Sequence, residues 1–136
     1  MRLKQHLFLV EHVLASRHDA TVEMLEIREL EPDQSANIRC RMRFWDGSIL
    51  VFNEALAIRG LVLAKIRYSF HYQSAGGQLI FRYDNVPHHP QIPTFPHHKH
   101  VSEPGTNTER IMAAHPPDIQ GILREIDRFL YPEVNR

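Results

Sequence analysis

Histidines and prolines gather in one stretch of the chain, from Arg82 to His100. The stretch holds five of the ten histidines in the sequence, and four of the nine prolines lie between Pro87 and Pro96. Because proline fixes the backbone angle φ and has no amide proton, such a segment is neither a helix nor a central strand. We therefore predict a rigid, extended loop that presents imidazole side chains at the surface.

Two kinds of chemistry suit the histidines of this loop. Imidazole exchanges protons near neutral pH, so the rings are candidates for general acid and base in phosphodiester cleavage, with Arg82 or Lys99 stabilising the charged phosphorane. RNA cleavage of this kind needs no metal or other cofactor, because the 2′-hydroxyl of the substrate is the nucleophile. The candidate catalytic residues are His71, Arg82, Asp84, His88, His89, His97, His98 and His100.

Metal binding is the alternative chemistry. Successive residues of an extended chain point to opposite sides, so His98 and His100 face one side together. With His88 or His89 and a carboxylate oxygen, they offer three or four ligands to a divalent transition metal such as zinc, although their spacing matches no standard zinc motif. A third interpretation is structural, in which the rings hydrogen-bond loop carbonyl groups. The alternative metal ligands are His88, His98, His100 and Asp84.

The composition is that of one ordinary globular domain spanning residues 1–136. Sixteen basic and sixteen acidic residues give a formal net charge of zero with histidine neutral, so the overall charge favours neither nucleic acid nor a membrane as a partner. Cys40 is the only cysteine, which excludes an intrachain disulfide and fits a reducing cytoplasm. No apolar run comes near the ~20 residues of a membrane-spanning helix.

Apolar residues recur at helical spacing near both ends of the chain and alternate with polar residues in between. This pattern predicts an α+β domain in which an antiparallel meander of about five strands is flanked by an N-terminal and a C-terminal helix on one face. The other face is left partly in solvent. Asp46-Gly47 predicts a type I′ turn in the middle hairpin. The predicted elements are a helix over residues 3–17, strands over residues 21–31, 38–44, 48–54, 61–72 and 79–84, and a helix that begins at Asp118. For residues 21–31 the content of Glu and Leu leaves a helix as the alternative.

Basic residues fall on the polar side of several predicted strands. If neighbouring strands turn their basic residues to the same side of the sheet, the open face is strongly basic and suits the backbone of RNA or DNA. The alternative is that these residues are solvated and paired across strands with acidic residues such as Glu23, Glu26 or Glu54. The candidate nucleic-acid-binding residues are Arg39, Arg41, Arg43, Lys65, Arg67 and Lys99.

Four segments in and around the histidine loop carry a family resemblance: Phe81-Arg82-Tyr83-Asp84-Asn85-Val86-Pro87-His88-His89-Pro90, Thr94-Phe95-Pro96-His97-His98-Lys99-His100, Tyr68-Ser69-Phe70-His71-Tyr72 and Asp46-Gly47-Ser48. Through these segments the chain resembles the TumE-type family of bacterial toxin–antitoxin proteins. This resemblance covers the chain from Ile38 to Leu130. The resemblance implies a small intracellular toxin, encoded beside an antitoxin that binds and neutralises it.

Together, the residues and the resemblance predict the toxin component of a type II toxin–antitoxin system, acting in the cytoplasm on RNA as a metal-independent ribonuclease. Cleavage is expected at the histidine loop beside the basic sheet face. A metal-dependent enzyme that uses the same loop, and a non-enzymatic module that binds nucleic acid or protein, are the alternatives. The expected partners are the cognate antitoxin and RNA, with no membrane, and the sequence leaves a homodimer open.

Overall fold

The computed structural model describes residues 2–103 and 105–133 of the chain. Within them, helix α1 spans Leu3–Ala15 and helix α2 spans Ile119–Leu130. Neither helix in this part of the chain has the length and apolar character needed to cross a membrane. The strands between the helices are β1 (Ala20–Glu31), β2 (Ser35–Phe44), β3 (Ile49–Arg59), β4 (Val62–Gln73), β5 (Leu79–Asp84), β6 (His98–Ser102) and β7 (Glu109–Ala113).

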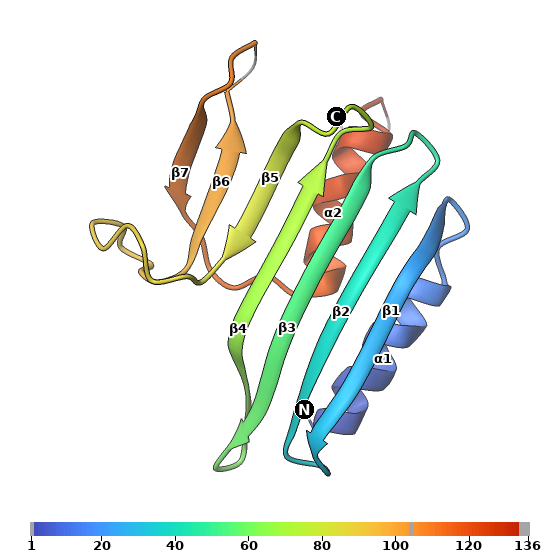
Figure 1. Ribbon diagram of the computed structural model, residues 1–136, viewed down its shortest axis with the longest axis vertical. Coiled ribbons are helices and arrows are strands. Elements are labelled where there is room, and N and C mark those ends of the chain that lie inside the picture. The colour runs from blue at the N-terminus through green and yellow to red at the C-terminus, as the bar shows by residue number, and fades with distance from the viewer. Residues whose placement is uncertain (1, 104, 134–136) are drawn as a thin grey trace.

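The strands form one antiparallel sheet in which each strand pairs with the next one along the chain. Both helices lie on the same side of this sheet, α1 near β1 and α2 nearer the middle (Figure 1). We call that side the helix face and the opposite side the open face. The predicted α+β meander with both helices on one face is therefore confirmed.

The described sheet has seven strands, whereas the sequence pattern indicated about five. The additional strands are β6 and β7, each five residues long. Because β6 begins at His98, only residues 85–97 of the predicted loop are irregular. Five residues are too few to show a clear alternation, and the prolines upstream hide the change from loop to strand. Pairing with β5 and β7 is what makes this segment a strand.

The hydrophobic core fills the space between the helix face and the two helices. Asp118, where the sequence predicted the start of the helix, is the N-cap of α2, its carboxylate accepting a hydrogen bond from the Gly121 amide at 2.7 Å. Cys40 is buried in this core, and burial raises the pKa of its thiol to about 12, so the thiol is inert. The buried helical residues are Leu3, Leu7, Val10 and Leu14 on α1, and Ile119, Ile122, Leu123, Ile126 and Leu130 on α2.

The turn between β2 and β3 differs from the predicted type I′ geometry. That turn needs a positive φ at both central residues, yet among the described residues only Asp33 and His89 combine a side chain with positive φ. The left-handed conformation falls instead on Gly47 (φ 86°), whose amide bonds to the Phe44 carbonyl oxygen at 2.9 Å. The predicted turn type is therefore wrong, because one left-handed glycine closes the hairpin at lower conformational cost.

A β-bulge decides which way the side chains of β4 point. Ala55 pairs with Arg67 and Leu56 pairs with Lys65, so Ile66 is an extra residue in β4. In a regular strand Lys65 and Arg67 would share a face. The bulge instead places Arg67 on the open face and Lys65 on the helix face.

Candidate active site

Four chemically active side chains stand on the open face of β5 and β6. Arg82 pairs in register with His100, and Asp84 pairs with His98. The intervening Lys99 reaches α2 on the helix face instead. Asp84 and His98 are almost fully buried, at 3% and 2% exposed. The strand register therefore brings together side chains that lie up to 18 positions apart in the sequence.

His89 joins these residues from the loop between β5 and β6. Its φ of 63° lies in the left-handed region, which is uncommon for a residue other than glycine. Its ring centre lies 5.2 Å from that of His98 and 6.0 Å from that of His100. One ring nitrogen from each of the three residues lies within 4.8 Å of the other two. We call His89, His98 and His100 the histidine cluster.

A hydrogen bond and an ion-pair contact on the outer side hold two of these rings in place. His98 Nδ1 donates to the Pro96 carbonyl oxygen at 2.9 Å, and His100 Nδ1 lies 3.3 Å from a Glu109 carboxylate oxygen. Both rings therefore turn Nε2 inward, where these two atoms are 3.1 Å apart. The Asp84 carboxylate faces both, at 3.0 Å from His98 Nε2 and 3.6 Å from His100 Nε2. Burial lowers the pKa of His100, despite the opposing effect of the Asp84 charge.

Arg82 connects Asp84 to His71. Its Nε donates to Asp84 Oδ2 at 3.0 Å, and its Nη1 lies 3.4 Å from His71 Nδ1. Burial, followed by the charge of Arg82, lowers the pKa of His71. A neutral His71 ring accepts from Arg82 at Nδ1 and donates from Nε2 to the Gln73 side-chain oxygen, 3.2 Å away. Contacts with Asp84 on one side and His71 on the other thus fix the position of the Arg82 guanidinium group.

A groove of about 480 Å³ lies on the open face beside this group of residues. Arg82 lines the groove together with Arg39 and Arg67, and polar Asn53 and Ser69 lie between them. Arg39 and Arg67 are exposed, and neither forms an ion pair within residues 2–103 and 105–133. We call the site formed by Arg39, Arg67 and Arg82 the arginine groove.

Arg41 and Arg43 also belong to the open face, but both are paired. Their Nε atoms donate to the two carboxylate oxygens of Glu23 at 2.9 and 3.1 Å. The hydrogen bonds from Arg43 and Arg41 lower the pKa of Glu23. For these two arginines, the predicted alternative of cross-strand pairing with Glu23 is confirmed. Of the predicted basic residues on the open face, those of the arginine groove therefore remain as candidates for binding nucleic acid.

The two candidate lysines lie on the helix face. Lys65 Nζ is 3.3 Å from a carboxylate oxygen of the buried Glu54, and Lys99 Nζ is 2.6 Å from Glu125 of α2. Neither lysine reaches the groove, because the bulge in β4 and the alternation of β6 turn them to the other side of the sheet.

Most of the chain, residues 10–131, matches a known protein family whose description is Toxin TumE. The chain belongs to the TumE toxin family. No curated protein and no solved structure matches it. The family resemblance of the histidine-loop segments is thereby confirmed, and membership in a toxin family implies a cognate antitoxin as partner.

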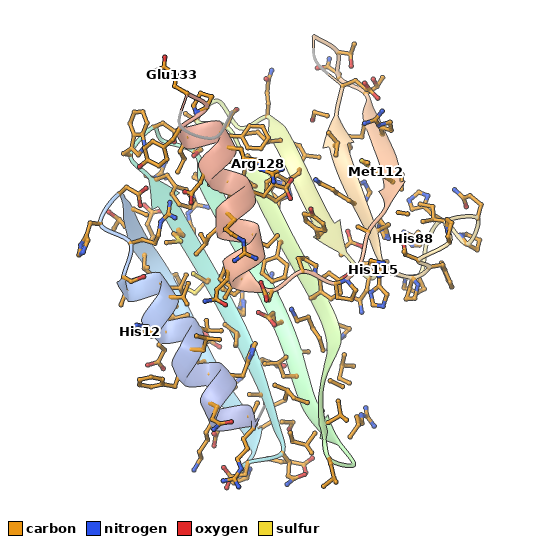
Figure 2. The ribbon with its side chains drawn as sticks, turned by 180° about the vertical axis from the view of Figure 1, so that it is seen from behind. His12, His88, Met112, His115, Arg128 and Glu133 are labelled. Carbon is orange, nitrogen blue, oxygen red and sulfur yellow. The ribbon has the colours of Figure 1, made fainter. Side chains whose placement is uncertain are left out.

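In this TumE-family chain, His97 and His88 stand apart from the histidine cluster. The His97 ring stacks on Tyr68 with its Nδ1 3.1 Å from the phenol oxygen, and burial lowers the pKa of His97. His88 is exposed on the loop beside β6 and β7 and contacts the His89 ring edge-on (Figure 2). The structure therefore brings His89, rather than His88, to His98 and His100.

Sequence reasoning did not assign to the site two residues that organise it in this TumE-family chain. Glu109 reaches His100 from β7, a strand that the pattern did not predict. Asn85 ties the start of the loop to the bulge in β4, accepting from the Tyr68 amide and donating to the Ile66 carbonyl oxygen, each at 3.0 Å. Neither contact has a sequence signal, because both depend on the register of strands far apart in the chain.

Proposed function

We propose that this TumE-family toxin cleaves RNA in the cytoplasm as the toxin component of a type II toxin–antitoxin system. The RNA backbone would bind in the arginine groove, and a phosphodiester bond would be cut at the histidine cluster. The position of Arg82 carries this proposal. Arg82 lines the groove and also donates to Asp84, which faces His98 and His100.

The arginine groove has the composition that suits a nucleic-acid backbone. Guanidinium groups match phosphate oxygens with paired donors and are more weakly hydrated than ammonium groups. Arg39 and Arg67 have no carboxylate partner among the described residues, so their donors are available to a ligand. A cationic groove that follows the backbone is the usual way to bind a single strand without strict sequence preference.

The histidine cluster supplies the reactive groups. Cleavage of RNA through its 2′-hydroxyl needs a group that removes the proton, a group that assists the leaving oxygen, and a cation near the phosphorane. Arg82 provides the cation. The imidazoles provide proton exchange, which the sequence favoured, or ligands for a metal ion that activates the attacking oxygen. Both routes end in a broken RNA strand, so the proposal of cleavage is common to them.

An antitoxin that blocks this site would need to cover the arginine groove or the loop beside it. An acidic antitoxin segment is the natural partner for unpaired arginines, because charge complementarity speeds association and fixes register. Such a segment would compete directly with RNA for Arg39 and Arg67.

The test is cleavage of an end-labelled single-stranded RNA by untagged protein, measured beside growth arrest on induction. Removing one group of an acid–base or metal site costs about 100-fold or more in rate, so His100→Ala should lose both cleavage and toxicity. His12→Ala, on α1 at the far side of the molecule (Figure 2), is the matched control and should keep both.

Two results would contradict the proposal. A toxic protein that binds RNA without cutting it would support the binding-module alternative instead. Undiminished cleavage by a folded His100→Ala variant would show that RNA is cut at another site.

A further inference from the structure

The inner side of the histidine cluster is crowded with lone pairs. His98 Nδ1 faces the Pro96 carbonyl oxygen, which only accepts, so Nδ1 carries a hydrogen. His100 Nδ1 lies 3.3 Å from a Glu109 carboxylate oxygen, an acceptor that favours the tautomer with its hydrogen on Nδ1. Neutral rings in this orientation present two Nε2 lone pairs to each other across 3.1 Å. In these tautomers the contact is repulsive unless a proton or a metal ion lies between the two nitrogens.

Two further acceptors face the same point. The Asp84 carboxylate lies 3.0 Å from His98 Nε2 and 3.6 Å from His100 Nε2. The His89 ring brings a third imidazole nitrogen within 4.8 Å of the other two. One added proton would satisfy a single pair among these groups, whereas a metal ion accepts lone pairs from all three rings at once.

We propose that His89, His98 and His100 bind a divalent transition metal ion, with zinc as the best match, and leave a fourth position for water. Imidazole is a preferred ligand of zinc, and three protein ligands plus water are typical of catalytic rather than structural zinc sites. The buried carboxylate of Asp84 adds the negative charge that favours a cation at this point. Hydrogen bonds from Arg82 Nε and the Val86 amide fix the orientation of this carboxylate.

The geometry is close to that of a tetrahedral centre. Zinc–nitrogen bonds of about 2.1 Å place neighbouring ligand atoms about 3.4 Å apart, near the 3.1 Å between the two Nε2 atoms. His89 has to move inward to reach this spacing, and it lies on an irregular loop rather than on a strand. The half-buried positions of His89 and His100 give an ion a route from solvent.

The outer contacts of the two rings match those of metal-binding histidines. Such histidines usually donate their second ring nitrogen to a carbonyl or a carboxylate, which fixes the ring and strengthens the ligand. His98 has the Pro96 carbonyl as this partner, and His100 has Glu109. The set of ligands and partners spans the β5–β6 loop, β6 and β7, so it exists only in the folded chain.

The role of the ion in RNA cleavage rests on the proposed function, whereas its binding does not. The experiment therefore measures binding first. Untagged protein, stripped with chelator and dialysed against micromolar Zn²⁺, should retain about one zinc ion per chain. Loading with Co²⁺ should give the visible absorption of a tetrahedral cobalt site, which is a readout independent of activity.

Matched variants locate the site. His89→Ala and His100→Ala should lose the bound zinc and the cobalt absorption, while His88→Ala, one position from His89 and exposed, should keep both. Glu109→Gln should bind zinc about 10-fold more weakly, the usual effect of removing an outer partner. Circular dichroism establishes that each variant is folded.

The outcomes separate the two proposals. Protein that cleaves RNA in excess chelator and retains no zinc overturns the metal site and leaves the ribonuclease intact. Protein that binds zinc through His89 and His100 but cuts no RNA supports the metal site and overturns the proposed function. Zinc retained equally by His100→Ala and His88→Ala overturns the assignment of the ligands.

Discussion

The arginine groove offers a test in which equal charge is removed from two places on the same sheet face. Arg39 and Arg67 line the groove without ion pairs among the described residues, whereas Arg41 and Arg43 share the carboxylate of Glu23. We predict that Arg39→Gln with Arg67→Gln weakens RNA binding strongly. Arg41→Gln with Arg43→Gln removes the same formal charge, but it should weaken RNA binding by less than half as much.

The magnitude follows from counterion release. Each phosphate contact to a single strand contributes about 0.7 to the slope of log affinity against log salt concentration. Loss of two contacts therefore lowers the magnitude of the slope by about 1.4. When salt rises from about 50 to about 200 mM, the factor by which the affinity of the variant falls should therefore be about 7 times smaller than the factor for the parent protein. The paired arginines already have a carboxylate as counterion, so their removal releases fewer ions.

Fluorescence anisotropy with a labelled single-stranded RNA measures both quantities. The measurement is made in the His100→Ala background, so that the RNA stays intact during the titration. Equal changes in slope for the two double variants would refute the reasoning, because binding would then depend on net charge rather than on the groove. An unchanged slope for the groove variant would place the RNA elsewhere on the protein.

Three further predictions concern stability. Lys65→Met removes the cation 3.3 Å from the fully buried carboxylate of Glu54 and should lower the free energy of unfolding, measured by urea denaturation, by about 3 kcal/mol. Lys65→Arg keeps the charge and should lower it clearly less. Equal losses of stability for the two variants would refute the charge argument. Burial opposes ionisation of Glu54, but its contacts with His6 and Lys65 outweigh burial and lower the pKa of Glu54. The stability that ionised Glu54 contributes is therefore complete above its unfolded pKa of about 4.3 and disappears as pH falls through the lower folded pKa. Glu54→Gln should flatten the acid limb of urea midpoints measured from about pH 6 to about pH 3. Gly47→Ala should cost about 1–2 kcal/mol of stability because the φ of this residue is left-handed. It should cost more than Gly77→Ala in the same assay, since the two glycines have similar φ but only at Gly47 does the new Cβ meet another side chain, that of Ala75 at 2.9 Å. Equal costs for the two variants would show that this contact relaxes freely.

The arrangement of Arg82, Asp84 and His71 gives the site a fixed centre. Asp84 accepts from the guanidinium and from the Val86 amide, so its carboxylate is held at the start of the loop. A substitution of His71 on β4 acts on the Arg82 guanidinium directly, and a substitution of His98 on β6 acts on it through Asp84. Substitutions on this hydrogen-bonded path are therefore expected to be non-additive in any assay of function.

The sequence alone determined the elements with strong local periodicity. Helical spacing of apolar residues located α1 and α2, alternation located β1 to β5, and glycine-containing turns located two hairpins. The prolines located the irregular part of the histidine loop, and the loop segments carried the family resemblance. These features depend on residues that are neighbours in the chain, so periodicity is sufficient to find them.

Only the tertiary structure decided which residues form the site. A bulge at Ile66 separates Lys65 from Arg67, and no periodicity reveals one extra residue in a strand. The left-handed backbone at His89 selects this histidine over its neighbour for the cluster. Strand register pairs Asp84 with His98. The physical reason is that each of these choices depends on contacts between segments far apart in the chain, whereas sequence pattern reports only local geometry.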